Sequence, residues 1–171
     1  MRRSYLLPAL GLVLLGVATR LVPHPANFTA IGALALWSTT LFESRKAAFA
    51  IPLLAMLISD LVLGLHPLLL WVYGAFMAIS IISLWIEPRV SGSRAVAGSL
   101  AASLLFFALT NFGVWTQGQM YPMNASGLAE CFAMGIPFLK NQIAGDLFYT
   151  VLLGAAARAL AGRRERALSK A

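Results

Sequence analysis

The chain has 171 residues, of which 60% are hydrophobic and 11% are charged, and its mean hydropathy is +0.81. Soluble globular proteins carry about 25% charged residues, so this composition argues against an ordinary soluble domain. The net charge of +7 points to anionic lipid or nucleic acid, and the position of the basic residues decides between them. A single cysteine, Cys131, excludes an internal disulfide and a zinc site made of cysteines.

Six apolar segments approach the roughly 20 residues that a membrane-crossing helix needs. We expect an all-α polytopic membrane protein, a bundle of six transmembrane helices that forms one domain over residues 1–171. The basic and apolar N-terminus imitates a signal peptide, but no clear cleavage site follows, so we expect it to be kept as the first span. The expected spans are 4–22, 27–42, 47–65, 68–86, 95–115 and 141–161.

The basic residues fall mainly on one side of this arrangement. With the N-terminus inside, 11 of the 13 lie on the cytoplasmic side, and only Arg20 and Lys140 fall toward the other side. Both termini are then cytoplasmic, and the positive charge is a topology signal rather than a nucleic-acid footprint. We expect a multi-pass protein of the bacterial cytoplasmic (inner) membrane whose C-terminal "RRERALSK" lies near anionic lipid headgroups.

Residues 116–140 are expected to form a long outer loop that contains methionine, aromatic, glycine and proline residues but few charges. Such a segment can fold over a cavity as a lid, and methionine adapts to irregular apolar shapes. Within it, "SGLAECFAMGI" is too short to span a membrane and favours a re-entrant or interfacial helix. Cys131 lies in this loop, either as an apolar filler or, speculatively, as a metal ligand. We predict no other metal site and no cofactor.

Nearly all polar residues that are not cytoplasmic anchors fall in the outer half of the expected bundle. Ionisable residues inside a membrane tend to face the protein interior or a wet cavity, so this pattern predicts a cup that opens outward above an apolar floor. A buried carboxylate needs a cation nearby, and Arg20 is the natural partner of Asp60 or Asp146, in a ligand site or in a purely structural ion pair. The predicted ligand-binding residues are Arg20, His24, Asn27, Asp60, Asn111, Asn141, Asp146 and Tyr149.

The sequence contains no phosphate-binding loop, no dinucleotide-binding glycine pattern, no metalloprotease histidine spacing and no G-x-S-x-G elbow. We therefore predict no catalytic residue and no enzymatic activity. Small residues spaced four apart in "AVAGSLAAS" predict close helix packing, inside the bundle or against a partner membrane protein. The pairs are Ala97/Ala101, Gly98/Ala102 and Ser99/Ser103.

Four stretches carry a resemblance to a known family: "RLVPHPANFTAIGALALW", "PLLAMLISDLVLGLH", "LLFFALTNFGVW" and "GIPFLKNQIAGDLFYT". They resemble a family of small bacterial integral membrane proteins known only as a domain of unknown function, over about residues 8–152. In size and expected layout the chain also looks like the substrate-binding S components of energy-coupling-factor vitamin transporters. That resemblance implies a ligand site near the outer face, a vitamin such as cobalamin as ligand, and a transmembrane subunit and ATPases as partners.

Two functions follow as expectations. The first is a substrate-binding or uptake subunit for a small vitamin-like molecule, and the mixed-sign polar residues suit a zwitterionic or hydrogen-bond-rich ligand. The alternative is a structural or assembly membrane protein that acts through helix–helix contacts and binds no ligand. In that case the polar residues would hold the bundle together, and the smooth alanine and glycine faces would contact partner helices.

Overall fold

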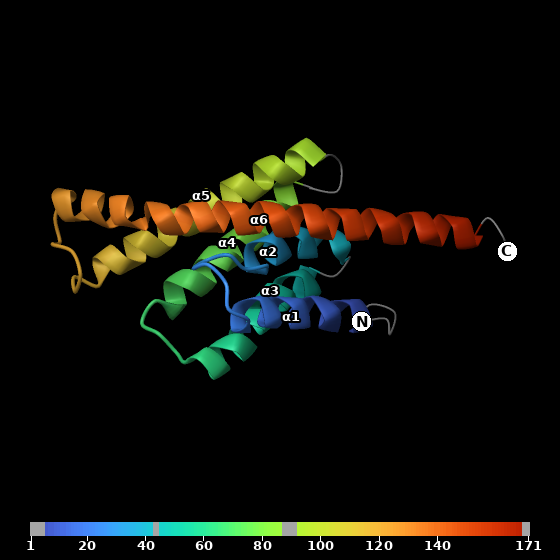
Figure 1. Cartoon of the computed structure of the whole chain (residues 1–171), viewed down its shortest axis with the longest axis horizontal. Helices are drawn as coiled ribbons and strands as arrows, with labels where there is room; N and C mark the ends of the chain where they lie inside the picture. The colour runs from blue at the N-terminus through green and yellow to red at the C-terminus, as the bar shows by residue number, and fades with distance from the viewer. Residues whose placement is uncertain (1–5, 43–44, 87–91, 169–171) are drawn as a thin grey trace.

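The computed structural model describes residues 6–42, 45–86 and 92–168, and these residues form six α-helices and no β-strand (Figure 1). The described residues therefore confirm the all-α class. The predicted first two residues of the first span, 4 and 5, and the last two residues of "RRERALSK" lie outside them. The helices are α1 (Leu6–Leu21), α2 (Ile31–Leu41), α3 (Arg45–Leu63), α4 (Leu69–Ile86), α5 (Gly92–Thr116) and α6 (Ala125–Leu168).

The helices run roughly along the long axis of the molecule, and α1 begins toward the same end at which α6 finishes (Figure 1). The 117–124 connection between α5 and α6 lies at the opposite end, and the turn after α1 and the connection from α3 to α4 lie further in, within the same half of the molecule. We call this half the cavity end. The start of α1 and the end of α6 thus lie on the same side of the molecule.

The central element is α2, the shortest helix. It packs against each of the other five helices, and every residue from Ala30 to Ser38 is buried. A helix that is apolar on all sides is typical of an enclosed position. Its 11 residues extend about 16 Å, whereas a membrane span needs about 30 Å, so α2 alone is too short to cross.

The predicted start of this helix at residue 27 is wrong. Residues 25–28 form a turn in which Asn27 has a φ of 65°, a left-handed conformation that a helix does not contain, and α2 begins only at Ile31. The backbone N–H of Phe28 donates to Pro25 O at 2.9 Å and closes the turn. The N–H of Ala30, which precedes the helix, donates to Thr19 Oγ1 of α1 at 3.1 Å. The first turn of α2 therefore begins inside the bundle with one of its amides satisfied by another helix.

The predicted lid over residues 116–140 is also wrong. α6 begins at Ala125 and continues for 44 residues, so the connection shrinks to 117–124 and the expected last span is one part of a longer helix. Pro137 lies inside α6 and removes only one backbone donor. Packing along α5 holds the helix through that point: Gly135 lies against Asn111, where a Cβ would meet the Asn111 side chain. Tertiary contacts therefore override the Gly and Pro signals that favoured a loop.

One described helix, Gly92–Thr116, is long and apolar enough to cross a membrane. The helices Leu6–Leu21, Ala48–Leu63 and Leu69–Trp85 are apolar but shorter. By length and composition, then, one of the six expected spans qualifies.

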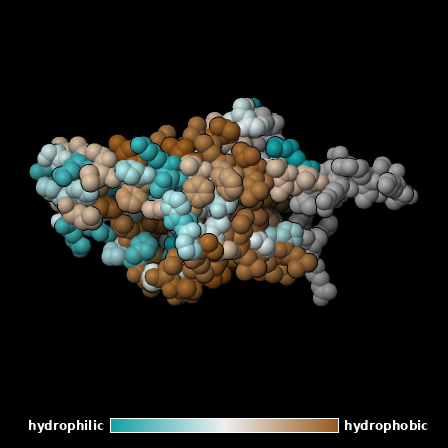
Figure 2. Space-filling view, viewed as in Figure 1, coloured by the Kyte–Doolittle hydropathy of each residue, from teal (hydrophilic) through white to brown (hydrophobic). Residues whose placement is uncertain are grey.

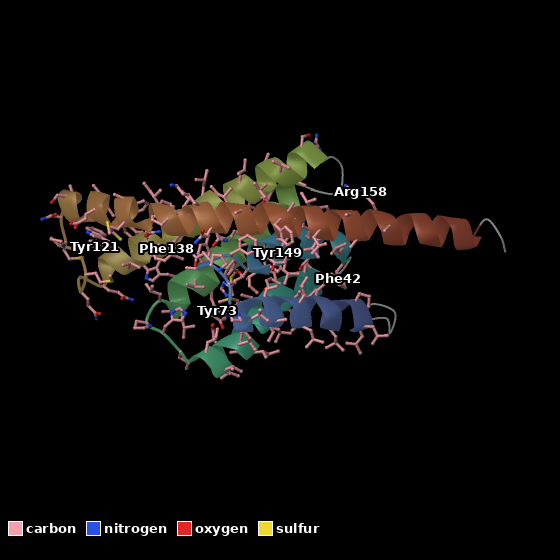
Figure 3. The ribbon with its side chains drawn as sticks, viewed as in Figure 1. Phe42, Tyr73, Tyr121, Phe138, Tyr149 and Arg158 are labelled. Carbon is pink, nitrogen blue, oxygen red and sulfur yellow. The ribbon has the colours of Figure 1, made fainter. Side chains whose placement is uncertain are left out.

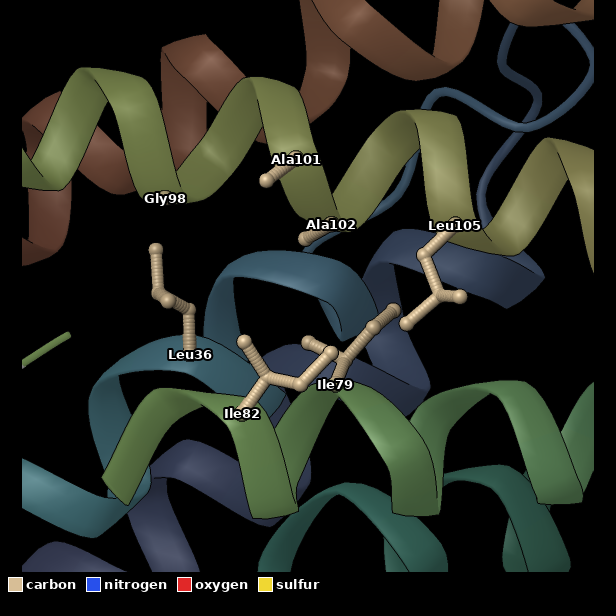
Figure 4. A pocket seen from close by; sticks show the side chains of 7 residues that line it. All are labelled: Leu36, Ile79, Ile82, Gly98, Ala101, Ala102 and Leu105. Carbon is tan, nitrogen blue, oxygen red and sulfur yellow. The ribbon is translucent and has the colours of Figure 1, made fainter. Parts of the chain in front are cut away.

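Small residues on α5 allow α4 to approach closely, as Figure 4 shows. Gly98 and Ala102 of α5 face Ile79 and Ile82 of α4 across an apolar void of about 10 Å³, with Leu36 of α2 beside it. A void of this size without polar groups stays dry. Of the three predicted small-residue pairs, Gly98/Ala102 and Ser99/Ser103 are buried within the bundle, whereas Ala97/Ala101 is exposed.

Candidate functional site

A cavity of about 280 Å³ lies toward the cavity end and is lined by residues of all six helices and of the turn after α1. We call it the first cavity. Its wall combines polar residues with apolar residues of α2 to α5, a composition typical of small-molecule sites. The polar lining residues are Arg20, His24, Asn27, Thr29, His66 and Gln142, and the apolar ones are Ile31, Met56, Leu63, Val72, Phe76 and Phe106.

Arg20 enters this wall from the last turn of α1 and forms an ion pair with Asp60 of α3, in which Nη2 lies 2.6 Å from Oδ1. Its Nη1 donates to Ser59 Oγ at 2.6 Å and to Met56 O at 3.2 Å. Tyr73 of α4, labelled in Figure 3, donates its hydroxyl to Asp60 Oδ2 at 2.9 Å. The Asp60 side chain is 1% exposed and that of Arg20 is 15% exposed. Arg20 thus presents a compensated charge to the cavity, and Asp60 positions it without lining the cavity.

His24 and Asn27 are held by the turn between α1 and α2. The His24 ring nitrogens lie near two carbonyl oxygens, with Nδ1 2.8 Å from Pro25 O and Nε2 3.3 Å from Arg20 O, and the tautomer decides which nitrogen donates. The left-handed backbone of Asn27 aims its side chain at the cavity wall.

We expect Asn27→Gly and Asn27→Ala to separate conformation from side-chain chemistry. Glycine adopts a φ of 65° freely, so the unfolding free energy of the Asn27→Gly variant should stay within about 0.5 kcal/mol of that of the wild type. Alanine should lower it by roughly 1 kcal/mol or more because its Cβ crowds the next carbonyl in this region. Thermal unfolding in detergent measures both variants. Equal stability of the two would show that the turn relaxes to another conformation.

Asp146 occupies a second polar cluster, between α2, α5 and α6, and is 1% exposed. Its Oδ2 accepts hydrogen bonds from Ser103 Oγ at 2.7 Å and from Gln142 Nε2 at 2.8 Å. Its Oδ1 has no hydrogen-bond partner among the described residues and lies against Gly32, the second residue of α2. The N-terminus of a helix favours negative charge, so the first turn of α2 compensates this carboxylate in part. Arg20 pairs with Asp60 and not with Asp146.

The predicted residues separate into several locations. Arg20, His24 and Asn27 line the first cavity, while Asn111 lines a second cavity of about 290 Å³ that adjoins it. Asn141 lines neither of these two cavities. Tyr149 packs among aromatic rings, with its centroid 5.9 Å from Phe28 and 5.0 Å from Phe148. The sequence predicted that these residues line a single cup. In the structure they are divided among an ion pair, two cavities and a separate buried carboxylate.

Three polar residues that line the first cavity are absent from the predicted set, namely Thr29, His66 and Gln142. Gln142 follows Asn141 directly, and only the rotational phase of α6 determines which of the two faces inward. His66 lies in the connection between α3 and α4. Its position shortly after Asp60 in the sequence is the feature that could have placed it near the predicted site. Gln142 also links the first cavity to Asp146 through its hydrogen bond.

Cys131 is buried on α6, and its thiol donates to Asn111 O at 3.3 Å. Among the described residues, no group of three or more histidine, cysteine, aspartate or glutamate side chains could hold a metal ion. The thiol lies at the α5–α6 contact, where Cys131 also lines the second cavity.

Comparison with curated proteins and with solved structures finds no match. A family model, described as a family of unknown function, matches residues 2–168, nearly the whole chain. The chain therefore belongs to DUF6580, a family of unknown function.

Proposed function

We propose that the protein is a membrane-embedded, substrate-binding subunit for uptake of a small vitamin-like molecule, with the first cavity open to the outer side. In this proposal the six helices form a multi-pass bundle in the bacterial cytoplasmic membrane with both termini in the cytoplasm. A transmembrane partner and ATPases would supply the energy for uptake. The observation that carries the proposal is the first cavity, a concave site where Arg20, His24, Asn27, His66 and Gln142 converge.

The distribution of polarity supports the membrane environment. On α3, Ser59 and Asp60 are fully buried, whereas Leu61 and Val62 are 70% and 68% exposed. Figure 2 shows broad apolar surface over the lower side, where α1 and α3 lie, and hydrophilic surface gathered at the cavity end. Soluble monomers rarely expose apolar patches this extensive, whereas lipid-facing helices do so by necessity.

The short helix α2 supports a binding site at depth in the bundle. Thr29 and Ile31, at the start of α2, line the first cavity. Discontinuous or short helices whose ends meet a cavity are the usual framework of ligand sites in transporters, because irregular backbone is tolerated in a membrane only inside protein or beside water.

The charge balance of the cavity defines the ligand. Asp60 neutralises Arg20, so the wall offers hydrogen-bond donors without a free positive charge. A simple anion would have to compete with a carboxylate 2.6 Å from the guanidinium. We therefore propose a neutral or zwitterionic ligand rich in hydrogen-bonding groups.

The test is to purify the protein in mild detergent and to identify retained small molecules by mass spectrometry, followed by thermal shift against a vitamin panel. His66→Ala removes a cavity side chain that has no hydrogen-bond partner among the described residues, and it should weaken retention about tenfold by deleting one ligand hydrogen bond. Lys140→Ala, at an exposed position of α6 outside the cavity, is the matched control and should retain ligand fully.

A structural or assembly role is the second candidate, favoured by the exposed Ala97/Ala101 pair on α5. It predicts that no small molecule is retained and that no vitamin shifts the unfolding temperature. That result would overturn the uptake proposal.

A further inference from the structure

The second cavity, of about 290 Å³, lies between α5 and the first turns of α6. Asn27, Val72 and Phe106 line both cavities, so the two adjoin. Figure 3 shows Tyr121 and Phe138, which line the second cavity, toward the end where α5 connects to α6. Each cavity is close to the lower limit of about 300 Å³ for small-molecule sites, and together they are well within the usual range.

The two cavities differ in chemistry. The first has Arg20, two histidines and Gln142 in its wall, whereas no described residue that lines the second is charged. The polar groups of the second are partly used within their own helix: Thr110 Oγ1 donates to Phe106 O and Asn111 Nδ2 to Phe107 O, both at 2.8 Å. The remaining lining is largely apolar or sulfur-bearing, namely Leu68, Val72, Phe106, Val114, Met120, Cys131, Met134 and Phe138.

The wall of the second cavity between α5 and α6 is fixed by close contacts. A Cβ on Gly135 would lie 2.8 Å from Phe107 Cε2, and the Phe107 and Phe132 rings meet edge to face with centroids 5.4 Å apart. Cys131 Sγ donates to Asn111 O in the same region. This part of the wall is therefore made by two closely packed helices.

We propose that the two cavities form one two-compartment site for an amphipathic, uncharged or zwitterionic small molecule, whose polar part lies by Arg20 and His66 and whose apolar part lies against Cys131, Met134 and Phe138. This inference rests on the proposed function and adds the chemical class of the ligand. Polarisable methionine and aromatic side chains suit a flat or irregular apolar body. The position of Cys131, the sole cysteine of the chain, provides a chemical reporter inside the apolar compartment.

The experiment compares methanethiosulfonate reagents on the full-length wild-type protein in detergent, followed by intact mass. The Cys131 thiolate attacks the sulfenyl sulfur, a mixed disulfide forms and methanesulfinate leaves. For each reagent, the rate with Cys131 is divided by the rate with free glutathione. This ratio should be at least about tenfold higher for the neutral benzyl reagent than for the sulfonatoethyl and trimethylammonioethyl reagents, because a charged group loses its hydration in an apolar cavity. Equal rates for the three reagents, or no reaction at all, would overturn the proposal.

Two variants control the result. Cys131→Ala combined with Glu130→Cys moves the thiol to the neighbouring exposed position, and the preference for the neutral reagent should disappear. Thr110→Phe fills the compartment without removing a hydrogen bond to another helix and should slow the benzyl reaction to the rate of the charged reagents. A benzyl rate unchanged in Thr110→Phe, with normal reactivity after denaturation, would show that Cys131 is reached by another route.

A membrane lipid shares amphipathic chemistry with a soluble ligand, and a second arm distinguishes them. The labelling is repeated in nanodiscs of phosphatidylethanolamine and phosphatidylglycerol. A small-molecule site stays reactive in lipid, whereas a benzyl reaction that stops only in the nanodiscs would assign the compartment to an acyl chain and overturn the proposal. The retention assay described above tests the proposed function separately. If labelling is selective but no ligand is retained, the uptake proposal is rejected. If a ligand is retained but does not protect Cys131 from labelling, the proposal of a second compartment is rejected.

Discussion

Gly32→Ala is expected to destabilise the protein by more than about 3 kcal/mol. A Cβ at Gly32 would lie 2.7 Å from Asp146 Cγ and still closer to its Oδ1. Both groups are buried, α2 is enclosed by five helices, and the carboxylate is held by Ser103 and Gln142. Neither side can withdraw without breaking a packed contact. Thermal unfolding in detergent and the fraction of monodisperse protein measure the loss.

The control and the rescue make this prediction specific. Gly74 of α4 has no atom within 4 Å of an added Cβ, so Gly74→Ala should be neutral or stabilising by up to about 1 kcal/mol. Asp146→Ala removes the carboxylate that Gly32→Ala would strike, so the double variant should recover more than half of the stability lost in Gly32→Ala. Additive losses in the double variant would place the conflict somewhere other than Asp146.

Arg20→Met is expected to cost about 3–5 kcal/mol, because it leaves the Asp60 carboxylate buried at 1% exposure with only Tyr73 as a donor. Asp60→Asn should cost less, since Arg20 is 15% exposed, lines the first cavity and keeps its bonds to Ser59 and Met56. The double variant should be more stable than Arg20→Met alone, because it removes the uncompensated charge. Unfolding free energies of the four proteins form a double-mutant cycle.

Phe28→Leu, distant from this ion pair in its contacts, serves as the control for general loss of packing at the cavity end. It should show no coupling to Arg20→Met. The ion-pair account fails if Asp60→Asn costs more than Arg20→Met, or if the cycle closes with no interaction energy.

Charge and hydropathy were sufficient to predict the all-α class and to name Asp60 as one of two candidate partners for Arg20. The ion pair was accessible because a buried carboxylate needs a nearby cation and the sequence offers few. The choice between Asp60 and Asp146 was not accessible, since both lie at similar depth in the expected spans. It depends on Ser103 and Gln142, which donate to Oδ2 of Asp146, and on the first turn of α2, which favours negative charge beside it.

The errors concern helix limits and helix rotation. Gly135 and Pro137 favour a loop when they are considered locally, and only the packing against α5 keeps α6 continuous. In the same way, the second span was predicted to begin at residue 27, but Asn27 has a left-handed backbone and cannot belong to the helix. A single sequence does not reveal that conformation. Asn141 was predicted to line the site, but its neighbour Gln142 does so. The wrong helix start explains this difference, because the face on which a residue lies depends on where its helix begins.

The uninterrupted course of α6 has a mechanical consequence. Cys131, Met134 and Phe138 in the wall of the second cavity stand on the same helix as Gln142 in the wall of the first, and Asp146 follows one turn later. At 1.5 Å per residue, its 44 residues form a rod of about 66 Å, far longer than the membrane core is thick. Because residues of both cavity walls belong to this one helix, the two walls cannot be repositioned independently while α6 stays helical.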